Sequence, residues 1–188
     1  MNLKLIDEIN ILVDRKLVIW LNVWAMVMFF VLLVGGFGLF LPPEGSVPIT
    51  ALGLLSFFIT LVLTFFLHEW IHGIFFKIFA PGSKVQYGFK IGMLYAANPG
   101  TKYNKQQFTV IVTMPFVIIT LLVFLSFIFP INRVALYLLF AIHTSGCVGD
   151  FYYCYKLWRN KNRPILIEDT AEGIKIFEVL KTNNTIER

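Results

Sequence analysis

Charged side chains are scarce in this 188-residue chain: Asp, Glu, Lys and Arg make up 14% of it, whereas 57% of the residues are hydrophobic. A soluble domain has roughly 25% charged and 45–50% apolar residues. The apolar residues are gathered in long runs without charges, which excludes an ordinary soluble domain and favours a membrane protein. The length fits a single domain over residues 1–188.

Cysteine is nearly absent as well, and this excludes a disulfide-stabilised fold. Cys147 and Cys154 lie seven residues apart in one hydrophobic run. On a helix this spacing is a rise of about 10.5 Å, which a disulfide cannot span. Two interpretations remain open for these cysteines: they compete as zinc ligands, because thiolate is a good zinc donor, or they are small apolar packing residues.

Acidic residues are the scarcer charges, with 11 Asp and Glu against 16 Lys and Arg, so the net charge is +5. In a soluble protein this balance would raise the question of nucleic-acid binding. Here the basic residues flank hydrophobic runs, so we interpret them as topology signals and as contacts to anionic lipid. We therefore expect the lipid bilayer as a partner, and no nucleic acid.

Four hydrophobic runs are long enough to cross a bilayer as helices. They cover residues about 17–41, 49–79, 108–129 and 134–157, and the first ends at Pro42-Pro43-Glu44-Gly45. This first run is too long for a signal-peptide core, so we keep it as a membrane anchor. The apolar residues of segment 3–16 have helical spacing, which predicts a short amphipathic helix on the membrane surface.

The basic residues also predict the orientation of the chain. Of the 16 Lys and Arg residues, only Arg133 lies on the side opposite to all the others. The positive-inside rule then places both termini, the 81–107 loop and the 158–188 tail in the cytoplasm. The expected protein is a multi-pass protein of a bacterial plasma membrane.

Two segments between and after the spans have strand patterns. Residues 84–95 alternate apolar with polar or small residues up to the turn Asn98-Pro99-Gly100, and residues 165–167 and 174–179 form a predicted hairpin in the tail. The expected fold class is thus an all-α membrane protein with four transmembrane helices and a small cytoplasmic β-hairpin. The 84–95 strand either holds an extended peptide at its edge or rests on the bilayer, and the alternation does not decide between them.

Ionisable residues within the spans are rare, and burying them in hydrocarbon is costly. One group is His68-Glu69-Trp70-Ile71-His72. Histidines four residues apart lie on one helix face and suit two corners of a tetrahedral zinc site. Glu69 can then take a proton from the water that the metal activates. The alternative interpretation is a buried polar cluster that joins helices.

The third zinc ligand is predicted to be Asp150. His72 lies five residues before the basic end of its span at Lys77, and Asp150 lies six before Lys156, which places them at nearly the same depth. Gly149 would let the two helices approach closely; the alternative role for Asp150 is a helix–helix hydrogen bond.

The third histidine of the chain, His143, is predicted to lie too deep for the same metal. It is roughly 10 Å further from the cytoplasmic side than Asp150, although both share a helix face. We therefore assign it a role in lining the cavity, where it would hydrogen-bond a substrate or a group behind the ligands.

Four motifs in order, HEWIHGIFF, KVQYGFKIGMLYAANPG, GCVGDFY and ILIEDTAEGIKIFE, resemble a bacterial family of membrane zincin peptidases over most of residues 50–180. The resemblance implies a four-span metallopeptidase in which His68 and His72 match the metal ligands. It likewise implies Glu69 as the catalytic acid and base and Asp150 as the acidic ligand. The layout is distantly similar to site-two proteases, although His143 stands where such families tend to have Asn.

The predicted function is zinc-dependent hydrolysis of peptide bonds near the cytoplasmic side of the membrane, acting on a peptide or a membrane protein. A membrane metal-binding or metal-transport protein is the alternative, but it gives Glu69 no role. A structural or adaptor protein with a degenerate site is a third possibility, which predicts no bound metal. The sequence does not indicate an oligomeric state.

Overall fold

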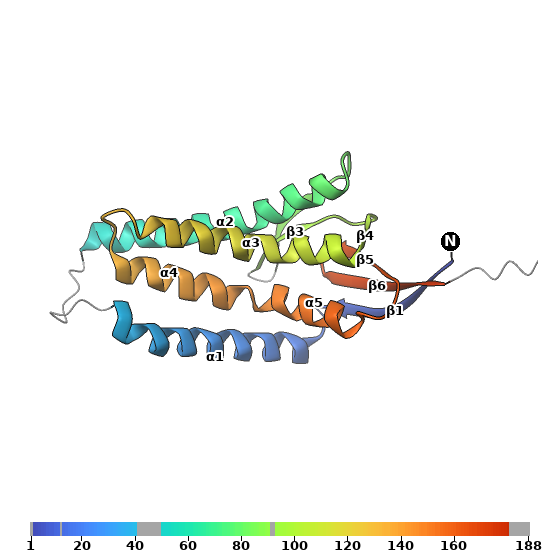
Figure 1. Cartoon of the computed structure of the whole chain (residues 1–188), viewed down its shortest axis with the longest axis horizontal. Coiled ribbons are helices and arrows are strands. Elements are labelled where there is room, and N and C mark those ends of the chain that lie inside the picture. Colours follow the sequence, from blue (N-terminus) through green and yellow to red (C-terminus); the bar gives the residue numbers. More distant parts are fainter. Residues whose placement is uncertain (1, 12, 41–49, 91–92, 181–188) are drawn as a thin grey trace, which may run out of the picture.

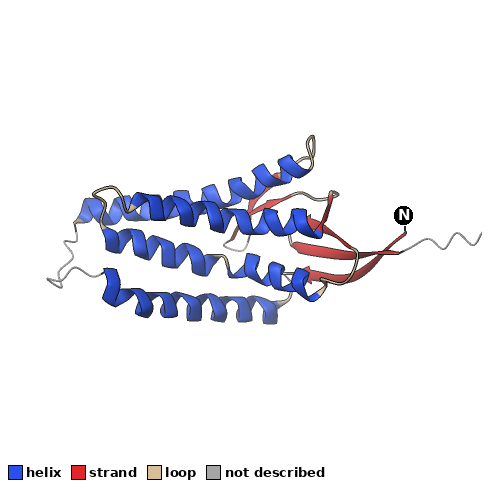
Figure 2. Cartoon of the chain, in the orientation of Figure 1, coloured by secondary structure: helices blue, strands red, loops and turns tan. Residues whose placement is uncertain are grey.

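The computed structural model describes residues 2–11, 13–40, 50–90 and 93–180, without the side chains of 37–40. The predicted turn at Pro42-Pro43-Glu44-Gly45 and the last eight residues of the tail lie outside these ranges. Helices fill one end of the molecule and strands the other (Figures 1 and 2).

Five helices form the long part of the molecule: α1 Arg15–Phe40, α2 Ala51–Phe79, α3 Lys105–Ser126, α4 Arg133–Gly146 and α5 Val148–Arg159. The first three are each long and apolar enough to cross a membrane. The single helix expected over 134–157 is wrong, because α4 and α5 meet at a bend of 45° around Cys147. The described residues thus contain three membrane-length helices, or four spans if the bent pair counts as one.

Helices α1 and α3 run away from the four-stranded end of the molecule, whereas α2 and the bent pair α4–α5 run toward it (Figure 1). Asparagine side chains cap two of them: Asn104 forms a capping box at the start of α3, and Asn132 accepts from the Ala135 amide at the start of α4. At the far end of the bundle α1 packs on α4, where the Tyr137 hydroxyl donates to the Leu32 carbonyl at 2.5 Å. A Cβ at Gly36 would lie 2.0 Å from the Tyr137 ring, so this contact requires glycine.

The amphipathic helix predicted over 3–16 is wrong. Residues Asn2–Asn10 form strand β1, which pairs antiparallel with β6, Gly173–Leu180. A register shift between Leu5 and Asp7 leaves Ile6 as an extra residue, a β-bulge. The bulge interrupts the two-residue alternation of apolar side chains, so the spacing in the sequence imitates that of a helix.

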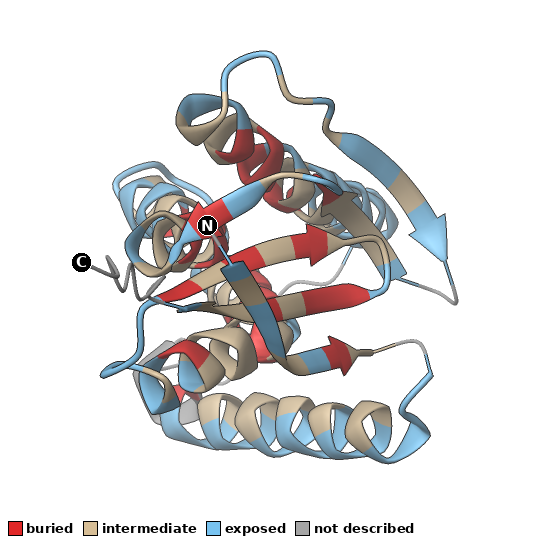
Figure 3. Cartoon of the chain, turned by 90° about the vertical axis from the view of Figure 1, so that its right-hand side faces the viewer, coloured by how far each residue is buried: buried red, intermediate tan, exposed pale blue. Residues whose placement is uncertain are grey.

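The predicted tail hairpin is present as β5, Ile165–Thr170, paired with β6. It is the centre of a larger four-stranded antiparallel sheet, in the order β1-β6-β5-β4, where β4 is Lys102–Asn104. Along β5 buried residues alternate with partly buried ones, and Figure 3 shows buried residues on the strands of this sheet. Its inner face contributes Ile167, Ile174 and Ile176 to a core that also holds Phe76 of α2 and Phe108 of α3.

The single strand predicted over 84–95 is two strands, β2 Gln86–Lys90 and β3 Met93–Ala97, which pair antiparallel. Residues 91–92 between them lie outside the described residues. Because apolar and polar residues alternate in both arms, the period of two could not reveal the reversal of direction. This small sheet packs against α2, on the side of α2 that carries Glu69 and Gly73.

Candidate active site

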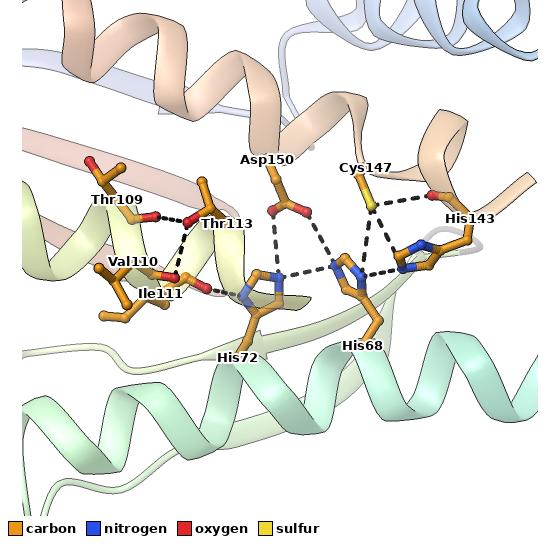
Figure 4. A network of polar contacts seen from close by, with 9 residues as sticks. All are labelled: His68, His72, Thr109, Val110, Ile111, Thr113, His143, Cys147 and Asp150. Atoms are coloured by element: carbon orange, nitrogen blue, oxygen red, sulfur yellow. Dashed lines mark hydrogen bonds and ion pairs between the residues drawn. The ribbon is translucent and has the colours of Figure 1, made fainter. Parts of the chain in front are cut away.

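His68 and His72 of α2 point toward Asp150 of α5 (Figure 4). Their Nε2 atoms are 3.1 Å apart. The carboxylate of Asp150 lies 3.2 Å from His68 Nε2 through Oδ2 and 3.5 Å from His72 Nε2 through Oδ1. Three potential ligand atoms from two helices therefore converge on one point in the interior, and both histidines are buried.

This triangle of atoms has the dimensions of a zinc site. Zinc bonds of about 2.0–2.2 Å to nitrogen and oxygen, in tetrahedral geometry, separate neighbouring ligand atoms by roughly 3.3–3.6 Å. The two Nε2 atoms are 3.1 Å apart, and each lies 3.2 or 3.5 Å from its nearer oxygen of Asp150, which is close to these values. Two imidazoles and one carboxylate are also a ligand set that catalytic zinc sites use, with the fourth position left open. The residues present thus fit the metal.

The position of His72 depends on a proline in α3. His72 Nδ1 lies 2.9 Å from the carbonyl oxygen of Ile111. Inside a helix this carbonyl would accept from the amide four residues later, but that residue is Pro115, which has no N–H. The free carbonyl accepts the Nδ1 proton of His72 instead, which leaves Nε2 as the atom with a lone pair toward the metal position.

The position of His68 depends on His143 of α4. His68 Nδ1 lies 3.1 Å from His143 Nε2, and His143 is almost fully buried. With its Nδ1 proton donated to His143, His68 also presents Nε2 to Asp150 and His72. The Nδ1 atom of His143 is buried and has no hydrogen-bond partner in the described part of the chain.

The bend between α4 and α5 aligns these groups. At Cys147 the backbone N–H lies 3.2 Å from the carbonyls of both His143 and Thr144. Asp150 thereby falls in the first turn of α5, where the helix dipole favours a carboxylate. His143 is about two helical turns from Asp150. His68 lies one turn deeper than His72, so it contacts Asp150 through Nε2 and His143 through Nδ1.

Glu69 is not part of the triangle. It lines a cavity of about 200 Å³ together with the three convergent residues, with 93–96 of β3 and with 169–173 around the β5–β6 turn. Its carboxyl group faces the backbone N–H of Ala96. An ion pair of 2.9 Å between Lys90 of β2 and Glu172 joins the two sheets beside this cavity. A potential proton acceptor therefore lies next to the open side of the potential metal position.

The family model described as "Putative zincin peptidase" matches residues 61–164. The chain belongs to this family. The match begins within α2 and ends just before β5, so it contains every member of the triangle as well as Glu69, His143 and Pro115. No curated protein and no solved structure matches the chain, so the similarity to site-two proteases stays a prediction. Membership of a zincin family implies zinc and suggests a metallopeptidase.

The zincin chain contains further site residues that the sequence analysis missed. Pro115 is one, because it leaves the Ile111 carbonyl free to bind His72. Its position in the middle of a hydrophobic run could have drawn attention to it. Asn98 is another, because it was interpreted only as a turn residue. Its side-chain N–H groups donate to Ser83 Oγ at 2.6 Å and to Tyr103 Oη at 2.8 Å. Its backbone N–H donates to the carboxylate of Asp169 at 3.2 Å, which ties the end of β3 to β5.

Burial shifts the pKa values of two of these groups in the sheet region. Desolvation raises the pKa of Asp169 well above its usual range, although the amide of Asn98 opposes this. Desolvation also raises the pKa of Tyr103 to about 12. Both residues therefore favour their uncharged forms, and their role in the zincin is to hold β3 beside the cavity.

Small residues bring the site elements together, although not at the expected position. Gly149 was predicted to allow close helix contact, but a Cβ there would meet nothing within 4 Å. The close contact is at Gly146, where a Cβ would lie 3.1 Å from the Phe65 ring. Gly73 of α2 is tighter still, since a Cβ would lie 1.8 Å from the Tyr87 hydroxyl of β2. Gly73 thus lets the small sheet lie directly on the helix that carries His68 and His72.

Proposed function

We propose that this protein is a membrane-embedded zinc peptidase in which His68, His72 and Asp150 hold the metal and Glu69 is the general base and acid. The observation that carries the proposal is the convergence of the three ligand atoms at zinc-site distances, with Glu69 on the cavity beside them. When bound, zinc supplies a Lewis acid that polarises a carbonyl group and acidifies water.

Glu69 performs the proton transfers of the reaction. Its carboxylate takes a proton from the water that attacks the scissile carbonyl carbon, and it gives a proton to the leaving amine as the C–N bond breaks. The position of Glu69 suits this role, because it lines the cavity without being one of the convergent ligands. A protein that only binds or transports metal would have no use for this carboxylate.

Two groups behind the ligands keep them oriented. The Ile111 carbonyl fixes the ring of His72, and His143 fixes the ring of His68. Such partners set which ring nitrogen carries the proton and raise the affinity for the metal. We therefore assign His143 a positioning role behind the metal site formed by His68, His72 and Asp150. We call this site the first metal site.

The substrate is proposed to be an extended peptide that lies along β3. Within the described residues β3 pairs with β2 alone, so its other edge is free for another strand. Residues 93–96 of β3 line the same cavity as Glu69, which places this edge beside the proton acceptor. Addition of a strand would hold the peptide through backbone hydrogen bonds, and side-chain pockets would select its residues.

We propose that the site opens toward the cytoplasm. The strands lie at the ends of the helices where both described ends of the chain are found (Figure 1). Lys77, Lys105 and Arg159 lie at this end, whereas Arg133 starts α4 at the other end. The positive-inside rule then assigns the strand end to the cytoplasm, so the substrate is a cytoplasmic peptide or the end of a membrane segment.

Metal content and peptide cleavage together test the proposal. Detergent-purified wild-type protein should contain about one zinc per chain, because three ligands suffice for a catalytic site. It should also cleave members of a panel of soluble and membrane-anchored peptides. His68→Ala should lose both the metal and the cleavage. A folded wild-type protein that binds no zinc would overturn the proposal, and activity on soluble peptides alone would remove the membrane-segment substrate.

A further inference from the structure

A second set of metal-binding atoms lies on the opposite side of His68. Cys147 Sγ is 3.9 Å from His68 Nδ1 and 3.7 Å from His143 Nε2, and these two nitrogens are 3.1 Å apart (Figure 4). All three side chains are buried, with Cys147 and His143 each 1% exposed. The proposed peptidase reaction does not use Cys147, and it uses His143 only as the hydrogen-bond partner of His68.

The distances in this group also match a metal site. Zinc bonds of about 2.3 Å to sulfur and 2.0–2.1 Å to nitrogen separate the ligand atoms by roughly 3.5 Å for S–N pairs and 3.3 Å for N–N pairs. The observed separations differ from these by a few tenths of an ångström, which small side-chain rotations remove. Two imidazoles and one thiolate form a soft ligand set that suits Zn²⁺, Cd²⁺ and Cu⁺.

A cavity gives this group room for a further ligand and a path to it. The cavity has about 390 Å³ and is lined by His68, His143 and Cys147, by Glu69, and by mostly apolar residues of α2 and of the small β2–β3 sheet. The thiol of Cys147 is held toward the histidines, because it donates to the His143 carbonyl at 3.2 Å. Cys154, the other cysteine, is half-buried and belongs to neither group of potential ligands.

We propose that His68 Nδ1, His143 Nε2 and Cys147 Sγ form a second metal site, specific for thiophilic ions, that competes with the first site for His68. A neutral imidazole has a lone pair on only one of its two ring nitrogens. A metal on Nδ1 therefore leaves the proton on Nε2, where Asp150 accepts it at 3.2 Å. A metal in the first site leaves the proton on Nδ1, where His143 accepts it at 3.1 Å. In each case a neighbouring residue accepts the ring proton of His68. A neutral His68 therefore binds a metal in one site or in the other, but not in both at once.

This competition has a consequence for the first site. An ion bound by Cys147 removes His68 from the triangle and leaves only His72 and Asp150. A thiophilic ion in the second site thus inactivates the first site without entering it. The inference concerns metal binding and does not rest on peptide hydrolysis.

Cadmium binding to the full-length protein in detergent tests the second site. Cadmium is softer than zinc and prefers thiolate, so the metal-free wild type should bind it with a thiolate-to-metal charge-transfer absorption in the ultraviolet. His72→Ala, which removes a ligand of the first site only, should keep one equivalent of cadmium and the same absorption. Asp150→Asn gives the same test with a smaller change in shape.

Two cysteine variants provide the matched comparison. Cys147→Ser should lose the charge-transfer absorption entirely but still bind one equivalent at the first site. Cys154→Ser should keep both the absorption and the stoichiometry of the wild type. Absence of the absorption in the wild type, or its persistence in Cys147→Ser, would overturn the second site. Loss of all metal from folded Cys147→Ser would instead count against the first site, and so against the peptidase proposal.

Discussion

The two halves of α2 are both rich in exposed apolar side chains, but the second half also carries the ionisable residues and a buried face. In the first half, Leu52, Phe58 and Val62 are 75%, 59% and 53% exposed. In the second half, His68, Ile71 and His72 are all buried. A side chain such as Phe58 needs lipid around it, whereas an ionisable residue in a span needs protein partners. The polar positions of the helix, more than its hydrophobicity, therefore indicate which half packs against other elements.

The largest effect is expected from removing the acid–base function in the buried half. Glu69→Gln should lower peptide cleavage by about 10²–10⁴-fold, because a general base contributes that much, while zinc content stays unchanged. Cleavage assays with metal analysis check this. Glu178→Gln, a change of the same kind on β6 away from the cavity, is the control and should leave cleavage intact. Unchanged cleavage in the Glu69 variant would favour a protein that only binds or transports metal.

The next effect is expected from the partner that α3 supplies to His72. Pro115→Ala restores a backbone N–H that bonds to the Ile111 carbonyl and so competes with His72 for it. Zinc affinity should fall by about 10–100-fold, as for other losses of a hydrogen bond behind a metal ligand. Competition with a chelator measures this affinity. Pro130→Ala, a proline change beyond the end of α3, should leave the affinity at the wild-type value.

A smaller effect is expected where the small sheet lies on α2. Gly73→Ala should displace Tyr87 and destabilise the protein by about 1 kcal/mol, because an extra methyl group does not fit a packed contact. Thermal unfolding in detergent measures this change. Adding Tyr87→Ala to the same chain provides the room and should recover part of the loss. If the double variant is no more stable than Gly73→Ala alone, Tyr87 is not the cause of the strain.

The smallest effect is expected in the exposed half of the same helix. Phe58→Ala should change the stability by no more than about 0.5 kcal/mol and leave zinc content and cleavage at wild-type levels, since its side chain has few protein neighbours to lose. The measurement is the same thermal unfolding. A large loss of stability or activity would mean that another chain, and not lipid, covers this half of α2.

The sequence predicted those features that depend on local residues. The long apolar runs correspond to the helices, and the alternation of residues 165–167 and 174–179 predicted the tail hairpin. His68, Glu69, His72 and Asp150 could be named as site candidates, because ionisable residues in an apolar run are unusual.

The remaining features depend on contacts between distant segments, which spacing alone does not predict. β1 was missed because its bulge disturbs the alternation, and its partner β6 lies at the other end of the sequence. The bend at Cys147 was missed because the apolar character continues across it. The contact between His143 and His68 follows from this bend, so it was not foreseen either.

The pairing of β1 with β6 has a consequence for the order of assembly. Asn10 lies opposite Gly173, and a Cβ at Gly173 would lie 1.9 Å from the Ile9 carbonyl oxygen, so the two strands fit only with glycine there. Ile11 and Gly173 both line the cavity of Glu69. Every described helix precedes β6 in the chain, and joining strands so far apart in sequence is slow. We therefore expect the helices to insert into the membrane before β6 pairs with β1. A partly synthesised chain would then contain the histidines but lack the residues around the β5–β6 turn that line the cavity.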